Sequence, residues 1–230
     1  MKTFKDEIVK IYDMLASKKR FSFSKYADGE WSIMCGKYIN NKEFSFSIFD
    51  RFYKNKLIES FKFKDKNYFV GISCYCCQGE NYFKMKEFSE QTEENLTFAN
   101  VFVNSNYEYY KKNFIEEYKK WDVILVANKN SKIDGLPFKL HKFYPVGFSA
   151  WKKDYSIIDK IKQEKYSGKL FLFACGPLGN LLAHQLWADN KNNTYLDIGS
   201  TLNPWLESEG FKRDYYKTDG ENSKRICIWK

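Results

Sequence analysis

The chain has 230 residues, of which 43% are hydrophobic and 19% aromatic, so it can bury a core and is not a disordered chain. Its 38 basic and 29 acidic residues give a net charge of +9, but the basic residues are scattered and form no block typical of nucleic-acid binding. No apolar run approaches the roughly 20 residues that span a bilayer, and the charged N-terminus does not resemble a signal peptide, so we expect a soluble, cytoplasmic protein with one domain over residues 1–230.

The first third of the chain alternates helical and strand patterns. Apolar residues recur at helical spacing over 3–17, which predicts an amphipathic helix. The alternating segment 20–27 predicts a strand that ends at Asp28 and Gly29, and we expect a helix over 30–35. The apolar segment 67–74 predicts a strand buried on both faces.

The rest of the chain continues this alternation. A short apolar run over 94–103 precedes a charged helical pattern over 106–121. Further strands are predicted over 122–128, 169–176, 194–200 and, as the last strand, 225–229; helices are predicted over 155–165 and 178–188.

Strands without polar alternation, separated by helices, are typical of a parallel sheet covered on both faces. We therefore predict an α/β, Rossmann-like fold with a mostly parallel sheet flanked by helices. Such sheets bind ligands at the carboxyl ends of their strands. Five polar or glycine-rich clusters follow predicted strands, which indicates one shared site: they lie at 28–30, from 74 onward, at 128, at 176–180 and at 197–200.

The glycine-rich turn ACGPLGN, residues 174–180, runs from a predicted strand into a helix. Gly176 and Gly179 would let a phosphate approach the backbone, Pro177 suits the first helical position, and Asn180 adds a polar side chain there. The turn is neither a full dinucleotide fingerprint nor a P-loop, so a purely structural turn explains it equally well. His184, one helical turn later, is interpreted as a packed or solvated helix residue.

The segment LDIGS, residues 196–200, places Asp197 and Ser200 at another predicted strand end. Asp197 would cap a backbone N–H in a structural interpretation. In a functional one it would contact a ribose, base or sugar hydroxyl, as acids at such strand ends do in nucleotide-binding folds. The residues alone leave both open.

The segment SKYADGEWSIMCG, residues 24–36, places Asp28 and Glu30 two positions apart. If the strand persists to Glu30, both carboxylates face the same way and could hold Mg²⁺ or Mn²⁺. Otherwise Asp28 caps the following helix and Glu30 lies in its first turn. Spacing alone favours the cap.

The six cysteines include the cluster Cys74, Cys76 and Cys77. No second cluster or histidine pair completes a zinc-like spacing, and the chain has only two histidines. We expect ordinary reduced cysteines of a cytosolic protein, with a metal or redox role as the lesser alternative.

Three segments together resemble the GT-D-type glycosyltransferases, a family with a Rossmann-like sheet and an Asp-x-Glu signature. The similarity extends over about residues 20–206, with FVNSNY (102–107) and VILVANK (123–129) in the expected order between the motifs. The three segments are SKYADGEWSIMCG (24–36), ACGPLGNLLAHQLW (174–187) and YLDIGSTLNPW (195–205).

This resemblance implies a metal-dependent transfer of a sugar from a nucleotide-diphosphate donor, which we expect to be a UDP-sugar, to a hydroxyl of a glycan acceptor. By position, Asp28 and Glu30 would bind the Mn²⁺ or Mg²⁺ cofactor, and both would be catalytic together with Asp197. The donor-binding positions would be Lys25, Gly29, Asn128, Gly176, Pro177, Gly179, Asn180 and Ser200.

Two positions depart from the family pattern: Lys25 stands in place of arginine and Ala27 in place of glycine. Lysine keeps the positive charge but loses the bidentate geometry of arginine. Asp197 and Glu80 are candidates for a base. Among Trp31, Tyr75, Trp151 and Trp205, we expect one or two to stack on a sugar ring.

Two other classes of protein compete with this interpretation. An S-adenosylmethionine-dependent methyltransferase would also have a glycine-rich turn and an acidic strand end, but LDIGS occurs late in the chain. A non-catalytic nucleic-acid-binding domain would explain the charge, yet no reading motif is present, so we expect no nucleic-acid partner. The charge is also compatible with weak association with a membrane surface.

Overall fold

The computed structural model describes residues 2–207 and 213–230. Seven strands form one sheet in the order β5-β4-β1-β9-β8-β6-β7, and every neighbouring pair is parallel. A small antiparallel hairpin, β2-β3, is separate from it. The strands are β1 (Ser22–Tyr26), β2 (Ile39–Asn40), β3 (Ser45–Phe46), β4 (Tyr68–Ile72), β5 (Leu96–Phe98), β6 (Val123–Asn128), β7 (Leu140–Val146), β8 (Leu170–Ala174) and β9 (Thr194–Asp197).

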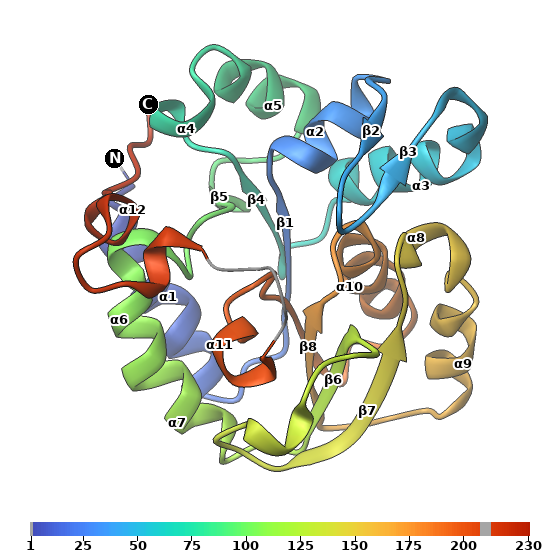
Figure 1. Cartoon of the computed structure of the whole chain (residues 1–230), viewed down its shortest axis with the longest axis vertical. Coiled ribbons are helices and arrows are strands. Elements are labelled where there is room, and N and C mark those ends of the chain that lie inside the picture. Colours follow the sequence, from blue (N-terminus) through green and yellow to red (C-terminus); the bar gives the residue numbers. More distant parts are fainter. Residues whose placement is uncertain (1, 208–212) are drawn as a thin grey trace.

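Helices cover both faces of the sheet, which makes the protein a layered α/β fold. Figure 1 shows α1, α6 and α7 on one side of the sheet and α8, α9 and α10 on the other. The helices are α1 (Phe4–Ala16), α2 (Asp28–Met34), α3 (Arg51–Lys62), α4 (Tyr75–Gln78), α5 (Asn81–Ser89), α6 (Tyr107–Tyr109), α7 (Ile115–Tyr118), α8 (Ala150–Lys153), α9 (Ile157–Gln163), α10 (Pro177–Asp189), α11 (Asn203–Leu206) and α12 (Glu221–Lys224).

Shorter helical turns connect several of these elements. A π-helical turn, η3, joins α6 to α7 and makes one continuous helical stretch of them. The turns are η1 (Ile48–Asp50), η2 (Asn104–Asn106), η3 (Tyr110–Phe114), η4 (Ile133–Gly135) and η5 (Asp214–Tyr216).

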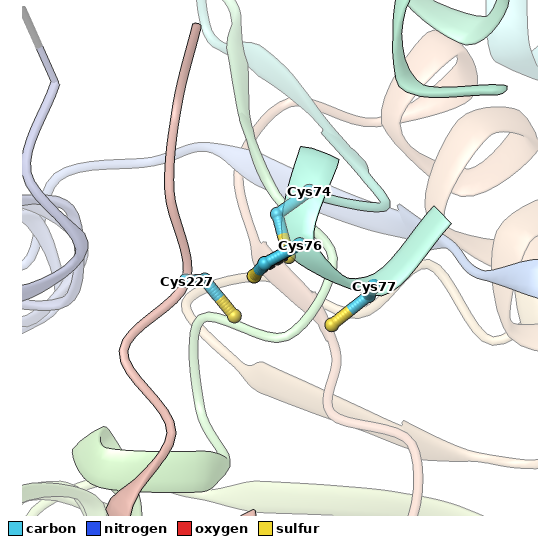
Figure 2. A group of neighbouring side chains, drawn as sticks. All are labelled: Cys74, Cys76, Cys77 and Cys227. Atoms are coloured by element: carbon cyan, nitrogen blue, oxygen red, sulfur yellow. Dashed lines mark hydrogen bonds between the residues drawn. The ribbon is translucent and has the colours of Figure 1, made fainter. Parts of the chain in front are cut away.

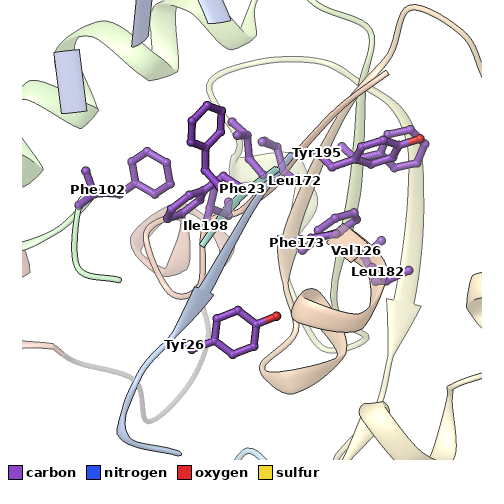
Figure 3. Close-up of a cluster of buried hydrophobic side chains, with 14 of the residues drawn as sticks. Phe23, Tyr26, Phe102, Val126, Leu172, Phe173, Leu182, Tyr195 and Ile198 are labelled. Atoms are coloured by element: carbon purple, nitrogen blue, oxygen red, sulfur yellow. The ribbon is translucent and has the colours of Figure 1, made fainter. Parts of the chain in front are cut away.

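The core is aromatic, as the composition suggests. On one face of the sheet, Phe23 of β1 packs edge-on against Phe102, with ring centroids 5.2 Å apart. In β8 and β9, Phe171 stacks on Tyr195 at 4.9 Å. Figure 3 shows buried hydrophobic side chains, aromatic and aliphatic, from β1, β6, β8, β9 and α10 in one cluster. Aromatic pairs of this kind add about 0.5–1.5 kcal/mol each beyond the burial of their area.

The predicted fold class is confirmed: the sheet is parallel throughout, and the expected helices and strands from residue 3 to residue 200 are present with small differences at their ends. β5 lies within the short apolar run at 94–103. The edge strand β7 was not predicted, because only β6 flanks it and its sequence LHKFYPV is polar and contains a proline.

The expected final strand at 225–229 is wrong. Cys227 and Trp229 are buried while Ile226 and Ile228 are exposed, so the alternation is real. The segment nevertheless joins no sheet. It is held instead by the Ser105 N–H, which donates to the Arg225 carbonyl at 3.1 Å, and by the packing of Trp229.

Within the described ranges, none of the helices combines the length and apolar character that a membrane span requires.

Candidate active site

The carboxyl ends of β1 and β9 meet the N-terminus of α10, and four polar residues form a hydrogen-bond network there. The Asn180 side-chain amide lies 2.6 Å from the Lys25 carbonyl, 3.1 Å from Ser24 Oγ and 3.4 Å from Asp197 Oδ2. The Lys25 backbone N–H also donates to Asp197 Oδ2 at 3.4 Å. Asn180 and Asp197 are buried, so this network ties the helix to both strands at the edge where such sheets bind ligands.

Lys25, which is partly buried, forms one group of charges with the buried Glu30 and Asp197. Burial raises the pKa of Asp197 to about 7, although the nearby Lys25 lowers it. Burial also raises the pKa of Glu30, again against the effect of Lys25. For Lys25 itself, burial would lower the pKa, but Asp197 and Glu30 outweigh burial and raise it. The site therefore keeps a cationic lysine beside carboxylates that are reluctant to ionise.

Asp28 and Glu30 both lie in the first turn of α2, not at the end of a strand. β1 ends at Tyr26 and α2 begins at Asp28, so the extended backbone that would align the two carboxylates is absent. Residues two apart on a helix point about 200° apart. Asp28 is exposed, whereas Glu30 is buried and its Oε2 accepts the Ala27 N–H at 2.9 Å. The expected cap is present, but Glu30 forms it, not Asp28.

Glycines bring the backbone close to this network. A Cβ on Gly179 would lie 3.2 Å from the Asp197 carboxyl carbon, so glycine lets α10 pack directly against β9. Gly199 has a φ of +55°, and a Cβ there would lie 2.3 Å from Cε of Lys25. The loop after β9 therefore packs directly against the Lys25 side chain, and its left-handed conformation at Gly199 favours glycine.

The β2-β3 hairpin covers this end of the sheet. Phe44 is buried, and its ring lies 2.8 Å from the position of a Cβ on Gly29 and 3.6 Å from one on Gly176. One aromatic ring thus spans the start of α2 and the start of α10. Sequence patterns did not identify Phe44, because a hairpin distant from the glycines brings it there.

Two tyrosines near the C-terminus contact the loop after β9. Tyr216 donates its hydroxyl to the Ser200 carbonyl, and the Tyr215 hydroxyl hydrogen-bonds to Ser200 Oγ. Both rings pack against Tyr107. These tyrosines belong to no motif, so no pattern in the sequence predicts their position beside Ser200.

Other expected positions lie apart from the network or in the core. Asn128 is exposed, and its Oδ1 accepts the Asn130 N–H at 2.9 Å within its own turn. His184 packs on Phe63 with centroids 4.5 Å apart, and burial lowers its pKa to about 4, which supports its interpretation as a packed residue. Glu80 is exposed at the start of α5.

Two of the four aromatic candidates for sugar stacking are in the core. Trp151 is fully buried and contacts Phe46 and Tyr53. Trp31 is also buried, against Phe88. Tyr75 and Trp205 are only partly buried and remain the candidates among the four.

No family model matches the sequence, and no curated protein matches it. Solved structures do. The chain is similar to a structure described as "A New Glycosyltransferase (DUF1792) from Streptococcus sanguinis", with a TM-score of 0.63, 15% identity, and coverage of 97% of this chain and 92% of that one.

It is also similar to the "highly conserved domain of unknown function 1792", described as having "a distinct glycosyltransferase fold". That match has a TM-score of 0.55, 16% identity, and coverage of 85% of this chain and 75% of the other. The arrangement of strands and helices described above is therefore the fold of domain of unknown function 1792, a distinct glycosyltransferase fold, as the sequence motifs predicted.

Proposed function

We propose that this protein is a metal-dependent glycosyltransferase that moves a sugar from a nucleotide-diphosphate donor, a UDP-sugar, to a hydroxyl of a glycan acceptor. The observation that carries the proposal is the position of Lys25 at the carboxyl ends of β1 and β9. Its side chain lies beside Gly199, Asp197 and Glu30 raise its pKa, and its backbone carbonyl accepts a hydrogen bond from Asn180 of α10. The fold shared with a structure described as a glycosyltransferase supports it.

The N-terminus of α10 suits a phosphate group. The helix has 13 residues and starts at Pro177, and its N-cap, Gly176, has no side chain that could satisfy the first backbone N–H groups. Free N–H groups and the helix dipole favour an anion at this place. Lys25 adds a full positive charge from the neighbouring strand. A diphosphate bound between the N-terminus of α10 and Lys25 would be stabilised by positive charge from both.

The donor set of α2 fits a divalent cation, with one change from the sequence interpretation. Asp28 offers an exposed carboxylate, and Glu30 keeps only Oε1 free because Oε2 accepts the Ala27 N–H. Mg²⁺ and Mn²⁺ bind through one or two carboxylates together with substrate phosphates. We therefore assign the cation to Asp28, with Glu30 as a second ligand. When bound, such an ion neutralises charge on the diphosphate.

Different residues of the chain then stabilise charge, position Lys25 and exclude water. Lys25 and the α10 N–H groups stabilise the negative charge that grows on the departing nucleoside diphosphate. Asn180 and Asp197 hold the Lys25 backbone, so their role is to position it; Asp197 oxygens already accept N–H groups from Lys25, Gly199 and Asn180. Ser200 lies on the loop that faces the donor, and Phe44 excludes water above the glycines.

The test is a thermal-shift and turnover screen of nucleotide sugars with and without Mn²⁺. We expect a UDP-sugar to stabilise the chain only when Mn²⁺ is present. Asp28→Asn should abolish this dependence and lower turnover by about 10²–10³-fold, the effect of losing one electrostatic contact in an active site. Asp122→Asn, an exposed acid that pairs with Lys169, should change neither.

Two results would contradict the proposal. Stabilisation by S-adenosylmethionine without metal would favour a methyltransferase. Strongly salt-dependent binding of oligonucleotides, with no response to nucleotide sugars, would favour a nucleic-acid-binding domain.

A further inference from the structure

Four cysteine sulfurs gather at the carboxyl end of β4, beside the candidate active site but outside it. Cys74, Cys76 and Cys77 lie at the start of and within α4, and Cys227 comes from the segment after α12. All four Sγ atoms lie within 4.8 Å of one another, and all four residues are free thiols. Figure 2 shows the sulfur of Cys227 directed from the C-terminal segment toward the cysteines of α4.

This spacing matches one tetrahedral ion. Zn–S bonds of about 2.3 Å place the four sulfurs about 3.8 Å apart at the corners of a tetrahedron. The sulfurs here already approach that separation, and small changes of side-chain torsion would complete it. In a cluster with several irons, the cysteines bind different iron atoms and lie farther apart. Four thiols in so small a volume therefore favour a single soft ion.

The surroundings supply a second shell. The Asn100 side-chain amide donates to Cys77 Sγ at 3.5 Å, and the Asn104 amide donates to Cys227 Sγ at 3.4 Å. Hydrogen bonds of this kind orient metal-binding side chains and stabilise their charge. Asn104 is buried and its backbone adopts the left-handed conformation, with a φ of +56°.

The basic residues near the four cysteines and the solvent access to them also suit a zinc ion. Four thiolates around Zn²⁺ carry a net charge of −2, and the C-terminal sequence SKRICIWK places Lys224, Arg225 and Lys230 on either side of Cys227. Cys76 is exposed while Cys74 and Cys227 are buried, which gives an entry path from solvent to an enclosed site.

We propose that Cys74, Cys76, Cys77 and Cys227 bind one structural Zn²⁺ that fastens the C-terminal segment to the end of β4. Sulfur ligands select zinc over Mg²⁺ and Mn²⁺, so this site is chemically separate from the cation proposed at Asp28. The same C-terminal stretch, residues 213–230, includes Tyr215 and Tyr216, which contact Ser200. Zinc would thus hold one wall of the candidate active site in place.

The experiment measures zinc in the reduced full-length protein by mass spectrometry, after exchange into buffer that contains a weak chelator. We expect one Zn²⁺ per chain. Replacement by Co²⁺ should give the absorption typical of tetrahedral thiolate coordination. Cys76→Ser and Cys227→Ser should each lose the stoichiometric metal. Cys35→Ser, which changes the exposed C-cap residue after α2 outside the group, should keep it.

A second readout separates loss of zinc from loss of folding. Circular dichroism should show that Cys76→Ser, which changes an exposed ligand, keeps the wild-type secondary structure. A strong chelator added to the wild-type protein should speed proteolytic cleavage within 213–230, while cleavage elsewhere stays the same.

Three results would overturn the proposal: the fully reduced wild-type protein contains no zinc and takes up none, Cys227→Ser keeps one equivalent, or the purified chain carries a disulfide between Cys74 and Cys76, whose sulfurs lie 3.1 Å apart. The last result would make the group a redox pair. None of these results depends on sugar transfer, so the zinc site and the proposed activity fail independently.

Discussion

Two regions at the same edge of the sheet are built in opposite ways. Asp28 and Glu30 are two positions apart in sequence, yet one is exposed and the other is buried against the backbone of Ala27. Cys77 and Cys227 are about 150 positions apart, yet they lie in one group of four sulfurs within 4.8 Å.

The difference comes from local geometry. A helix that begins at Asp28 separates near neighbours by rotation, whereas parallel strands bring distant segments to one edge. The group of charges follows the second pattern: Lys25 and Asp197, 172 positions apart, share a hydrogen bond. Short spacing in a motif therefore does not ensure that two side chains have the same environment in this fold.

The largest effect that tests this comparison is the pH dependence of stability contributed by Asp197. An unfolded aspartate ionises near pH 3.8, and burial raises the pKa of Asp197 in the folded chain to about 7. Folding therefore favours the protonated form, and the stability it provides is lost as the pH rises from about 4 to about 7. The free energy of unfolding of wild type relative to Asp197→Asn should fall over this range by as much as about 4 kcal/mol.

Urea unfolding at several pH values measures this difference. His184, whose folded pKa is lowered by burial to about 4, contributes the opposite slope to both proteins, so it cancels. Asp122→Asn is the control, because the hydrogen bond from Lys169 lowers the pKa of that exposed acid and it does not titrate in this window. A wild-type-minus-variant difference that stays flat would show that Asp197 is not part of the group of charges.

A smaller effect separates the two acids of the motif. Glu30→Ala removes the acceptor for the Ala27 N–H and should lower the free energy of unfolding by about 1–2 kcal/mol, as the loss of a helix cap does. Asp28→Ala should cost less than about 0.5 kcal/mol, because its carboxylate is exposed and gains only from the helix dipole. Equal losses for both variants, in denaturant titrations at pH 7, would mean that the two carboxylates act as a pair.

The last effect, of similar size to that of Glu30→Ala, concerns the contact between the β9 loop and Lys25. Gly199→Ala should cost about 1–2 kcal/mol for the left-handed conformation and should also displace the lysine side chain. Gly36→Ala, at a φ of +76°, would place its Cβ in ordinary contact with Lys54 Nζ at 3.9 Å, so it should lose stability only through the backbone conformation. We expect Gly199→Ala to lower nucleotide-sugar turnover while Gly36→Ala does not. Similar turnover in both variants would show that the position of Lys25 is not important for the reaction.

Several features could be predicted from the sequence because they depend on local patterns. Buried strands without alternation, separated by amphipathic helices, indicated a parallel sheet with helices on both faces. The motifs around Asp28, Gly176 and Asp197 indicated the fold and the edge at which the site lies. For His184 the sequence left a packed and a solvated position open, and the structure shows that it is packed on Phe63.

Other features were decided only by tertiary structure, because they depend on where distant segments meet. The start of α2 at Asp28 left Asp28 exposed and made Glu30 the acceptor of the Ala27 N–H. The hairpin placed Phe44 over Gly29 and Gly176. The C-terminal segment, whose alternation predicts a strand, brought Cys227 to Cys74, Cys76 and Cys77 without joining the sheet. A local pattern specifies which face of a segment is buried, but only the packing of the whole chain specifies what that face touches.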